Sequence, residues 1–113
     1  MKPSYLFITF LLLLQPSLAD GATLHVPSQY ATIQEDVNAS STNDTVMIAS
    51  GTYTGTGNKN LEFFGKAITV QSSNGPEYCI IDCQNSGRGA YFHHNEGRGT
   101  VLRGVTIRNG SMP

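Results

Sequence analysis

The chain has 113 residues and a formal net charge of −1, from seven Lys and Arg side chains against eight Asp and Glu. Charged residues make up 13% of the chain and hydrophobic residues 39%, a balance that suits one small domain. So weak and negative a charge excludes an electrostatic footprint for nucleic acid or for an anionic membrane surface. The abundance of Gly, Ser, Thr and Asn favours turns and short strands over long helices.

The N-terminus has the pattern of a secretory signal peptide over residues 1–19. A positive start at Lys2 precedes an apolar run from Tyr5 to Leu14, and small residues then prepare a cleavage point after Ala19. Ten apolar residues cannot cross a bilayer core, which takes ~20 in a helix. We therefore expect a secreted mature segment of residues 20–113 with no membrane span. An uncleaved signal anchor is the alternative.

One short helix is expected after a strand at residues 24–26. Thr32 followed three residues later by Glu35 is a capping box, in which each side chain satisfies a free backbone N–H at the helix start. Ile33 and Val37 then share one face, so the helix should cover the core of another element and end near residue 41. The positions expected to face water are Gln34, Glu35, Asp36 and Asn38.

Beyond residue 44, short apolar segments alternate with Gly and Asn at a spacing of 22 or 23 residues. This spacing predicts an all-β, right-handed parallel β-helix of about three coils, with three strands in each coil. The columns of stacked residues that it predicts are Val46, Ile68 and Tyr91; Ile80 and Leu102; and Leu61, Cys83 and Val105. An immunoglobulin-like sandwich is disfavoured, because its strands would not recur in three columns.

Stacking is what makes such coils stable. One coil has too thin an apolar face to offset its ordering entropy, whereas coils ~4.8 Å apart pair every strand and share one core. The helix near residues 32–41 would cover the first, open end of the stack. No second cap is recognisable, so we expect this chain to be a truncated, N-terminal part of a longer β-helix that continues downstream. A short protein that dimerises end to end is the alternative.

Two kinds of covalent modification are suggested. Asn-x-Ser/Thr triplets at Asn38, Asn43 and Asn109 are candidate N-glycosylation sites. Cys79 and Cys83 would meet oxidising conditions outside the cell, but an extended strand would hold their Cα atoms ~13 Å apart, beyond disulfide reach. A local disulfide therefore needs a sharp turn between them, and burial or a more distant partner is the favoured alternative.

The side chains that could carry chemistry are few. His93, His94 and Glu96 resemble a metal cluster, but adjacent strand residues point to opposite faces, so a polar turn is the preferred interpretation. Asp82 with Arg88 or Arg103 could form an acid–base pair, although a turn-forming aspartate explains it better. Amide ladders are expected near the glycine turns, at Asn74, Asn85, Asn95 and Asn109. No catalytic residue, cofactor site or metal site is assigned.

Three segments carry a family resemblance: residues 25–37 (HVPSQYATIQEDV), residues 44–55 (DTVMIASGTYTG) and residues 65–110, which begin GKAITVQSSNG. Together they resemble the N-terminal coils of secreted β-helix proteins of the pectin-lyase-like superfamily, most specifically over residues 65–82. The opening also resembles pectin methylesterases. A departure is the Glu35-Asp36 pair, where such helices usually carry small apolar residues.

The resemblance implies a right-handed β-helix but not one activity. The superfamily includes polysaccharide lyases, hydrolases and esterases, and also adhesins and surface proteins without known chemistry. We expect a non-catalytic extracellular or cell-surface segment that serves as a scaffold, an adhesin or a glycan-binding surface. The alternative is the inactive N-terminal portion of a secreted polysaccharide-active enzyme. The expected partner is a polysaccharide or cell-surface glycan.

Overall fold

Alternating burial along short strands builds the interior. A computed structural model describes residues 21–111, so the signal peptide predicted at residues 1–19 lies outside the described part of the chain. In β1 (Thr23–Val26) the last side chain is buried, and in β2 (Thr45–Ile48) Val46 and Ile48 are buried while their neighbours are only partly covered. A period of two is the expected consequence of strand geometry.

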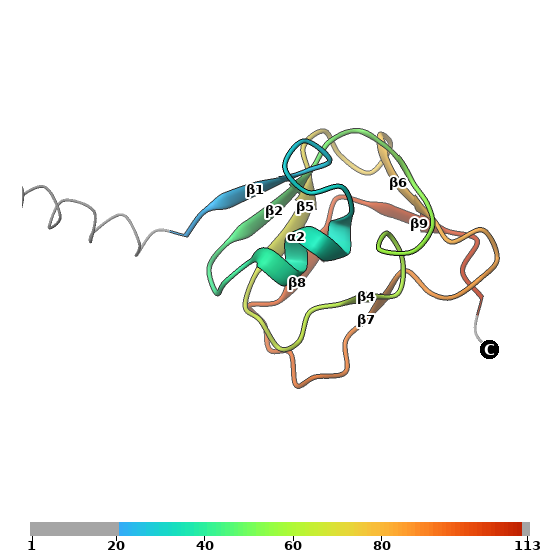
Figure 1. Cartoon of the computed structure of the whole chain (residues 1–113). Helices are drawn as coiled ribbons and strands as arrows, with labels where there is room; N and C mark the ends of the chain where they lie inside the picture. The colour runs from blue at the N-terminus through green and yellow to red at the C-terminus, as the bar shows by residue number, and fades with distance from the viewer. Residues whose placement is uncertain (1–20, 112–113) are drawn as a thin grey trace, which may run out of the picture.

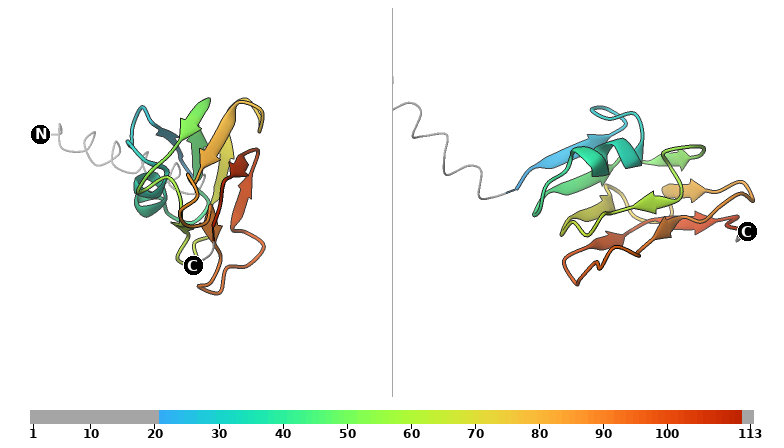
Figure 2. Two further views of the ribbon diagram at one scale, coloured as in Figure 1. Left: turned by 90° about the vertical axis from the view of Figure 1, so that its right-hand side faces the viewer. Right: turned by 60° about the horizontal axis from the view of Figure 1, so that its bottom comes forward.

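The strands form three parallel sheets, and successive coils lie as layers on one another (Figures 1 and 2). The sheets contain, in order, β1, β2, β5 (Thr69–Ser72) and β8 (Val101–Arg103); β3 (Gly51–Tyr53), β6 (Cys79–Asp82) and β9 (Thr106–Arg108); and β4 (Leu61–Glu62) and β7 (Ala90–Tyr91). Within each sheet, every two neighbouring strands run parallel. The predicted β-helix, a solenoid of about three turns, is confirmed.

The columns predicted from the 22-residue spacing are wrong. Val46 pairs with Val70, and Val70 pairs with Leu102. Ile68 lies just before β5, and Tyr91 belongs to the separate β4–β7 sheet. The residues predicted to stack in one column therefore lie in different parts of the coil.

The other two predicted columns fail in the same way. Leu61 pairs with Ala90 and not with Cys83, and Ile80 pairs with Thr106. The apolar spacing does not predict strand β3, because Gly51 and Thr52 give it no apolar pattern. The fold class is thus independent of the exact partners that the spacing suggested.

Unequal coil lengths explain these errors. Equivalent positions in the four-stranded sheet are 22, 24 and then 32 residues apart, at Thr23, Thr45, Thr69 and Val101. The connection after β5 spans residues 73–78, whereas only two residues separate β2 from β3. The connection after β7 spans residues 92–100, whereas the one after β4 spans 63–68. The last full coil is therefore enlarged by its loops.

The helix α2 (Ile33–Ala39) closes the first end of the stack. Thr32 is its N-cap, and both hydrogen bonds of the predicted capping box with Glu35 are present. Ile33 and Val37 are fully buried, and the helix contacts β1, β2 and β4. The predicted capping helix is confirmed, apart from a slightly earlier end.

Asp36 corrects the predicted polar face of this helix, because it is fully buried and does not face water. Its Oδ1 accepts a 3.5 Å hydrogen bond from the Ser40 hydroxyl, while Oδ2 has no hydrogen-bond partner. Burial raises the pKa of Asp36 from 3.8 to about 6; the Ser40 hydrogen bond and His25 lower it, and Asp44 raises it further. The carboxyl group lies where the helix packs on the first coil.

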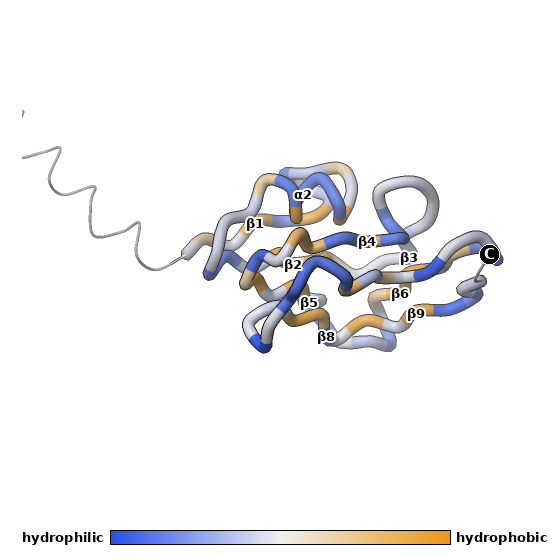
Figure 3. The backbone as a smooth tube through the Cα atoms, turned by 90° about the horizontal axis from the view of Figure 1, so that it is seen from below, coloured by the Kyte–Doolittle hydropathy of each residue, from blue (hydrophilic) through white to orange (hydrophobic). Residues whose placement is uncertain are grey.

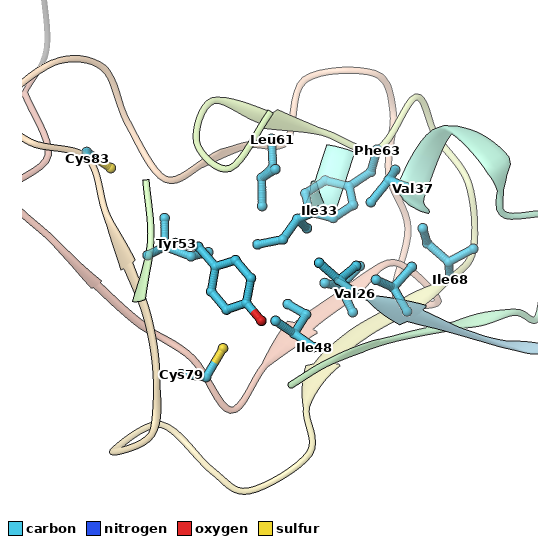
Figure 4. Close-up of a cluster of buried hydrophobic side chains, with 13 residues drawn as sticks. Val26, Ile33, Val37, Ile48, Tyr53, Leu61, Phe63, Ile68, Cys79 and Cys83 are labelled. Atoms are coloured by element: carbon cyan, nitrogen blue, oxygen red, sulfur yellow. The ribbon is translucent and has the colours of Figure 1, made fainter. Parts of the chain in front are cut away.

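The core is one cluster of apolar side chains from the strands, α2 and the turn after β4 (Figure 4). Hydrophobic residues follow the strands and the inner side of α2, and the connecting turns are mostly hydrophilic (Figure 3). Ile33 and Leu61 point toward each other across the interior (Figure 4). Within residues 21–111, no helix has the length and apolar character needed to cross a membrane.

Candidate functional site

The pairing of β4 with β7 brings together side chains that are distant in the sequence. Glu62 lies opposite Tyr91 in this two-stranded parallel sheet. The enlarged loop of residues 92–100 follows β7 directly and carries His93 and His94. Glu62 is therefore beside both histidines, although about thirty residues separate them along the chain.

The three side chains form a compact cluster, the Glu62–His93–His94 cluster. The Glu62 Oε1 atom is 3.3 Å from His93 Nε2 and 3.9 Å from His94 Nδ1. The two imidazole rings have centroids 4.0 Å apart and are inclined by 52°. About a third of each side chain is exposed, at 36%, 32% and 41% for Glu62, His93 and His94, so the cluster is open to solvent.

The expectation that His93 and His94 face opposite ways is wrong, because neither lies on a strand. Strand β7 ends at Tyr91, and both rings come from the loop that follows and approach the same Glu62 oxygen. Glu96, the third residue of the candidate cluster weighed from the sequence, is not in this group; Glu62 takes that position. No local sequence signal identifies Glu62, since only the strand pairing places it there.

Glu96 instead holds the loop in position. Its carboxylate accepts hydrogen bonds from the backbone N–H of His94 at 2.8 Å and of Gly65 at 3.1 Å. Burial opposes ionisation of Glu96, but these hydrogen bonds outweigh it and lower its pKa below the ordinary value. The ionised carboxylate thus joins the loop to the turn of the coil beneath.

Aromatic contacts fix the same loop. Phe92 stacks on the buried Phe63 of the preceding coil, with ring centroids 4.7 Å apart. His93 stacks on Tyr91 at 3.7 Å, and the Arg88 guanidinium lies 4.2 Å from the Tyr91 ring centroid. One ring face cannot hold two groups this close, so Arg88 and His93 lie on opposite faces of Tyr91.

Two surface depressions adjoin the cluster. One has a volume of about 520 Å³ and is lined by Asn60, Glu62, Ser86, Gly87, Arg88, Tyr91 and Ser111. The other has a volume of about 380 Å³ and is lined by Gln34, Asn38, Thr56, Gly57, Lys59, Asn60, Glu62 and Phe64. Asn60 and Glu62 line both, so the depressions lie next to each other, and we call the two together the β4 surface. Its lining is rich in amide, guanidinium, ammonium and hydroxyl groups.

Asp82 does not pair with either predicted arginine. Its carboxylate accepts hydrogen bonds from Arg108 Nε at 3.3 Å, from Asn109 Nδ2 at 3.0 Å and from the Gln84 backbone N–H at 2.9 Å. These bonds, led by the one from Asn109, lower the pKa of Asp82. A carboxylate kept ionised in this way cannot serve as a general acid near neutral pH. The hydrogen bond from the Gln84 N–H agrees with the preferred role in a turn, and the alternative pairing with Arg88 or Arg103 is not found.

The asparagines near the turns support the backbone rather than a ladder of stacked amides. Asn85 and Asn109 both have positive φ, and the Asn85 N–H donates to the Asn109 carbonyl oxygen in the next coil. The Asn74 amide donates to the Ser50 hydroxyl one coil away, at 2.9 Å. The predicted inter-coil hydrogen bonds exist, but their partners are a hydroxyl, a carboxylate and backbone groups.

The candidate modification sites are placed as follows. Asn38, Asn43 and Asn109 are all exposed, the first at the end of α2 and the other two in turns.

Cys79 and Cys83 are free thiols, both completely buried. The two sulfur atoms enter the core at separate places, and Cys79 lies near Tyr53 (Figure 4). Burial raises the pKa of the Cys79 thiol.

Comparison with known proteins finds no family model, no curated protein and no solved structure that matches this chain.

Proposed function

We propose that this chain belongs to a secreted, non-catalytic β-helix protein of the pectin-lyase-like superfamily, and that its β4 surface binds a glycan. The observation that carries the proposal is the pair of neighbouring depressions that share Asn60 and Glu62 in their lining. Two adjoining depressions that mix apolar and hydrogen-bonding groups suit a chain of several sugar units better than one small ligand. The resemblance of residues 24–110 to the superfamily supports the extracellular setting.

The chemistry of the lining suits sugar hydroxyl groups. Arg88 and Lys59 supply donors only, whereas Asn60 supplies both donors and acceptors. Sugar hydroxyls both donate and accept, so such a mixed lining can satisfy several of them at once. Tyr91 is 40% exposed and supplies an apolar ring edge beside these groups. Since Arg88 and His93 occupy its two faces, the ring acts here as a support for Arg88.

The non-catalytic character rests on the state of the carboxylates. Asp82 is held ionised by three hydrogen bonds, and Glu96 is occupied by two backbone N–H groups. Polysaccharide cleavage by acid–base catalysis wants a pair of carboxyl groups with different protonation states, placed across one bond. Neither carboxylate is free for such a pair, and within residues 21–111 Glu62 is the one carboxylate that lines the β4 surface.

A glycan array with the full chain tests the proposal, together with a polymer-cleavage assay on pectins. We expect selective binding, a loss of about tenfold in affinity for Arg88→Ala, and no cleavage. Arg103→Ala is the matched control, because Arg103 lies in the four-stranded sheet and bonds Gln71. Equal losses from the two variants would contradict the assigned surface. Clear turnover of a polymer would favour the polysaccharide-active enzyme instead.

A further inference from the structure

We propose that Glu62, His93 and His94 bind a divalent transition-metal ion such as Zn²⁺. The three candidate ligand atoms all lie within 4.8 Å of one another. Zinc binds imidazole nitrogen and carboxylate oxygen at ~2.0–2.2 Å, which puts the ligand atoms of a tetrahedral site ~3.3 Å apart. Glu62 Oε1 and His93 Nε2 are already 3.3 Å apart. His94 Nδ1, at 3.9 Å from the same oxygen, needs only a small movement.

The composition of the cluster selects the class of metal. Two imidazoles and one carboxylate suit zinc, copper and nickel, whereas magnesium and calcium prefer oxygen ligands alone. The nitrogens use different ring positions, Nε2 of His93 and Nδ1 of His94, which lets adjacent residues in a bent loop reach one ion. Three protein ligands leave a position for water or a further ligand. This position is accessible, because all three side chains are partly exposed.

The surroundings hold the ligands in place before any ion binds. Gln34 bonds both the backbone N–H and the carbonyl oxygen of Glu62 at 2.9 Å. His93 is stacked on Tyr91, and the His94 N–H is held by Glu96. A site whose ligands are fixed by neighbouring contacts loses less entropy on binding.

Titration of the metal-free full chain with zinc, monitored by calorimetry, tests the site directly. We expect one ion per chain, and a loss of about tenfold or more in affinity for each of Glu62→Gln, His93→Ala and His94→Ala. Cobalt should give a visible absorption spectrum that changes with the same three variants. Affinity should fall on acidification, because protons compete for the imidazoles. Circular dichroism of each variant without metal verifies that it folds.

The matched controls are His25→Ala and Glu77→Gln, which remove the third histidine of the chain and an exposed glutamate outside the cluster. Both should bind zinc as the parent chain does. Absence of a saturable zinc site in the folded parent chain, or equal affinity in Glu62→Gln and Glu77→Gln, would overturn the proposal. The titration contains metal alone, so its outcome is independent of glycan binding.

Discussion

The side-chain amide of Gln34 pairs with the backbone of Glu62 as a neighbouring strand would. Its Nε2 donates to the Glu62 carbonyl oxygen and its Oε1 accepts from the Glu62 N–H, both at 2.9 Å. Strand β4 has β7 on one side and α2 on the other, where no strand is available among residues 21–111. One glutamine in the capping helix thus satisfies the open edge of β4 and fixes the backbone of Glu62.

Replacing this glutamine should destabilise the first coils. Gln34→Glu keeps the size of the side chain but loses the donor, so a carboxylate oxygen would face the Glu62 carbonyl oxygen. We expect a loss of about 1–3 kcal/mol in the free energy of unfolding, measured by urea denaturation. The same change at the exposed Gln84, outside α2, should cost much less. Equal effects of the two would refute the strand-like role of Gln34.

Lys66 should be a strong determinant of stability. Its ammonium group donates to the carbonyl oxygens of Val37, Asn38 and Ser40 at 2.9, 3.0 and 2.8 Å, at the C-terminal end of α2. The last turn of this helix contains no basic residue, so Lys66 supplies the positive charge from the second coil. Lys66→Ala should lower the free energy of unfolding by about 1–3 kcal/mol, measured by thermal or urea unfolding.

Lys66→Arg serves as the control for this prediction. It keeps the charge, but a planar guanidinium cannot reproduce three bonds that converge on one nitrogen, so part of the loss should remain. An alanine variant as stable as the parent chain would show that these bonds only replace equivalent bonds to water.

Asp36 should make the stability fall as pH rises from about 4 to about 6. Its pKa is about 6 in the folded chain against an ordinary value of 3.8, so the folded state binds more protons than the unfolded state within that window. Above pH 6 the buried, ionised carboxylate costs the fold up to about 3 kcal/mol. Asp36→Asn should remove this slope, measured as unfolding free energy against pH. A slope unchanged from the parent would contradict the assignment, and Glu77→Gln is the exposed control.

The two cysteines should resist modification while the chain is folded. Both side chains have no exposed surface, and burial raises the pKa of Cys79, which lowers its thiolate fraction. We expect Ellman's reagent to label neither thiol of the freshly purified, reduced chain under native conditions, and both in guanidinium chloride. Rapid labelling of the folded chain would mean that the core around Tyr53 and Cys79 opens easily.

Local signals in the sequence determine the elements of this protein. The Thr32–Glu35 capping box involves residues three apart, so it could be predicted, and the structure contains it. The recurrence of short apolar segments between glycine turns was sufficient for the β-helix class and for most strands. β3 was missed, because its residues Gly51 and Thr52 have no apolar pattern of their own.

Only the tertiary structure decided which residues of different coils lie opposite each other. The enlarged loops, residues 73–78 and 92–100, lengthen the coil between Val70 and Leu102, so a constant period could not predict that these two residues stack. Asp36 is buried because of how α2 packs over the first coil, although the polarity of its side chain opposes burial. Strand register is set by how apolar side chains of distant segments pack together, and no local sequence pattern reports this packing energy.

The Glu62–His93–His94 cluster depends on the same distinction. The sequence by itself places two histidines together, but it does not indicate that a loop turns both rings toward one glutamate. The pairing of Glu62 with Tyr91, which lies 29 positions further along the chain, places the glutamate beside the two histidines. Capping and turn preferences depend on residues a few positions apart, so the local sequence determines them. A site shared by two coils exists only after the coils have stacked.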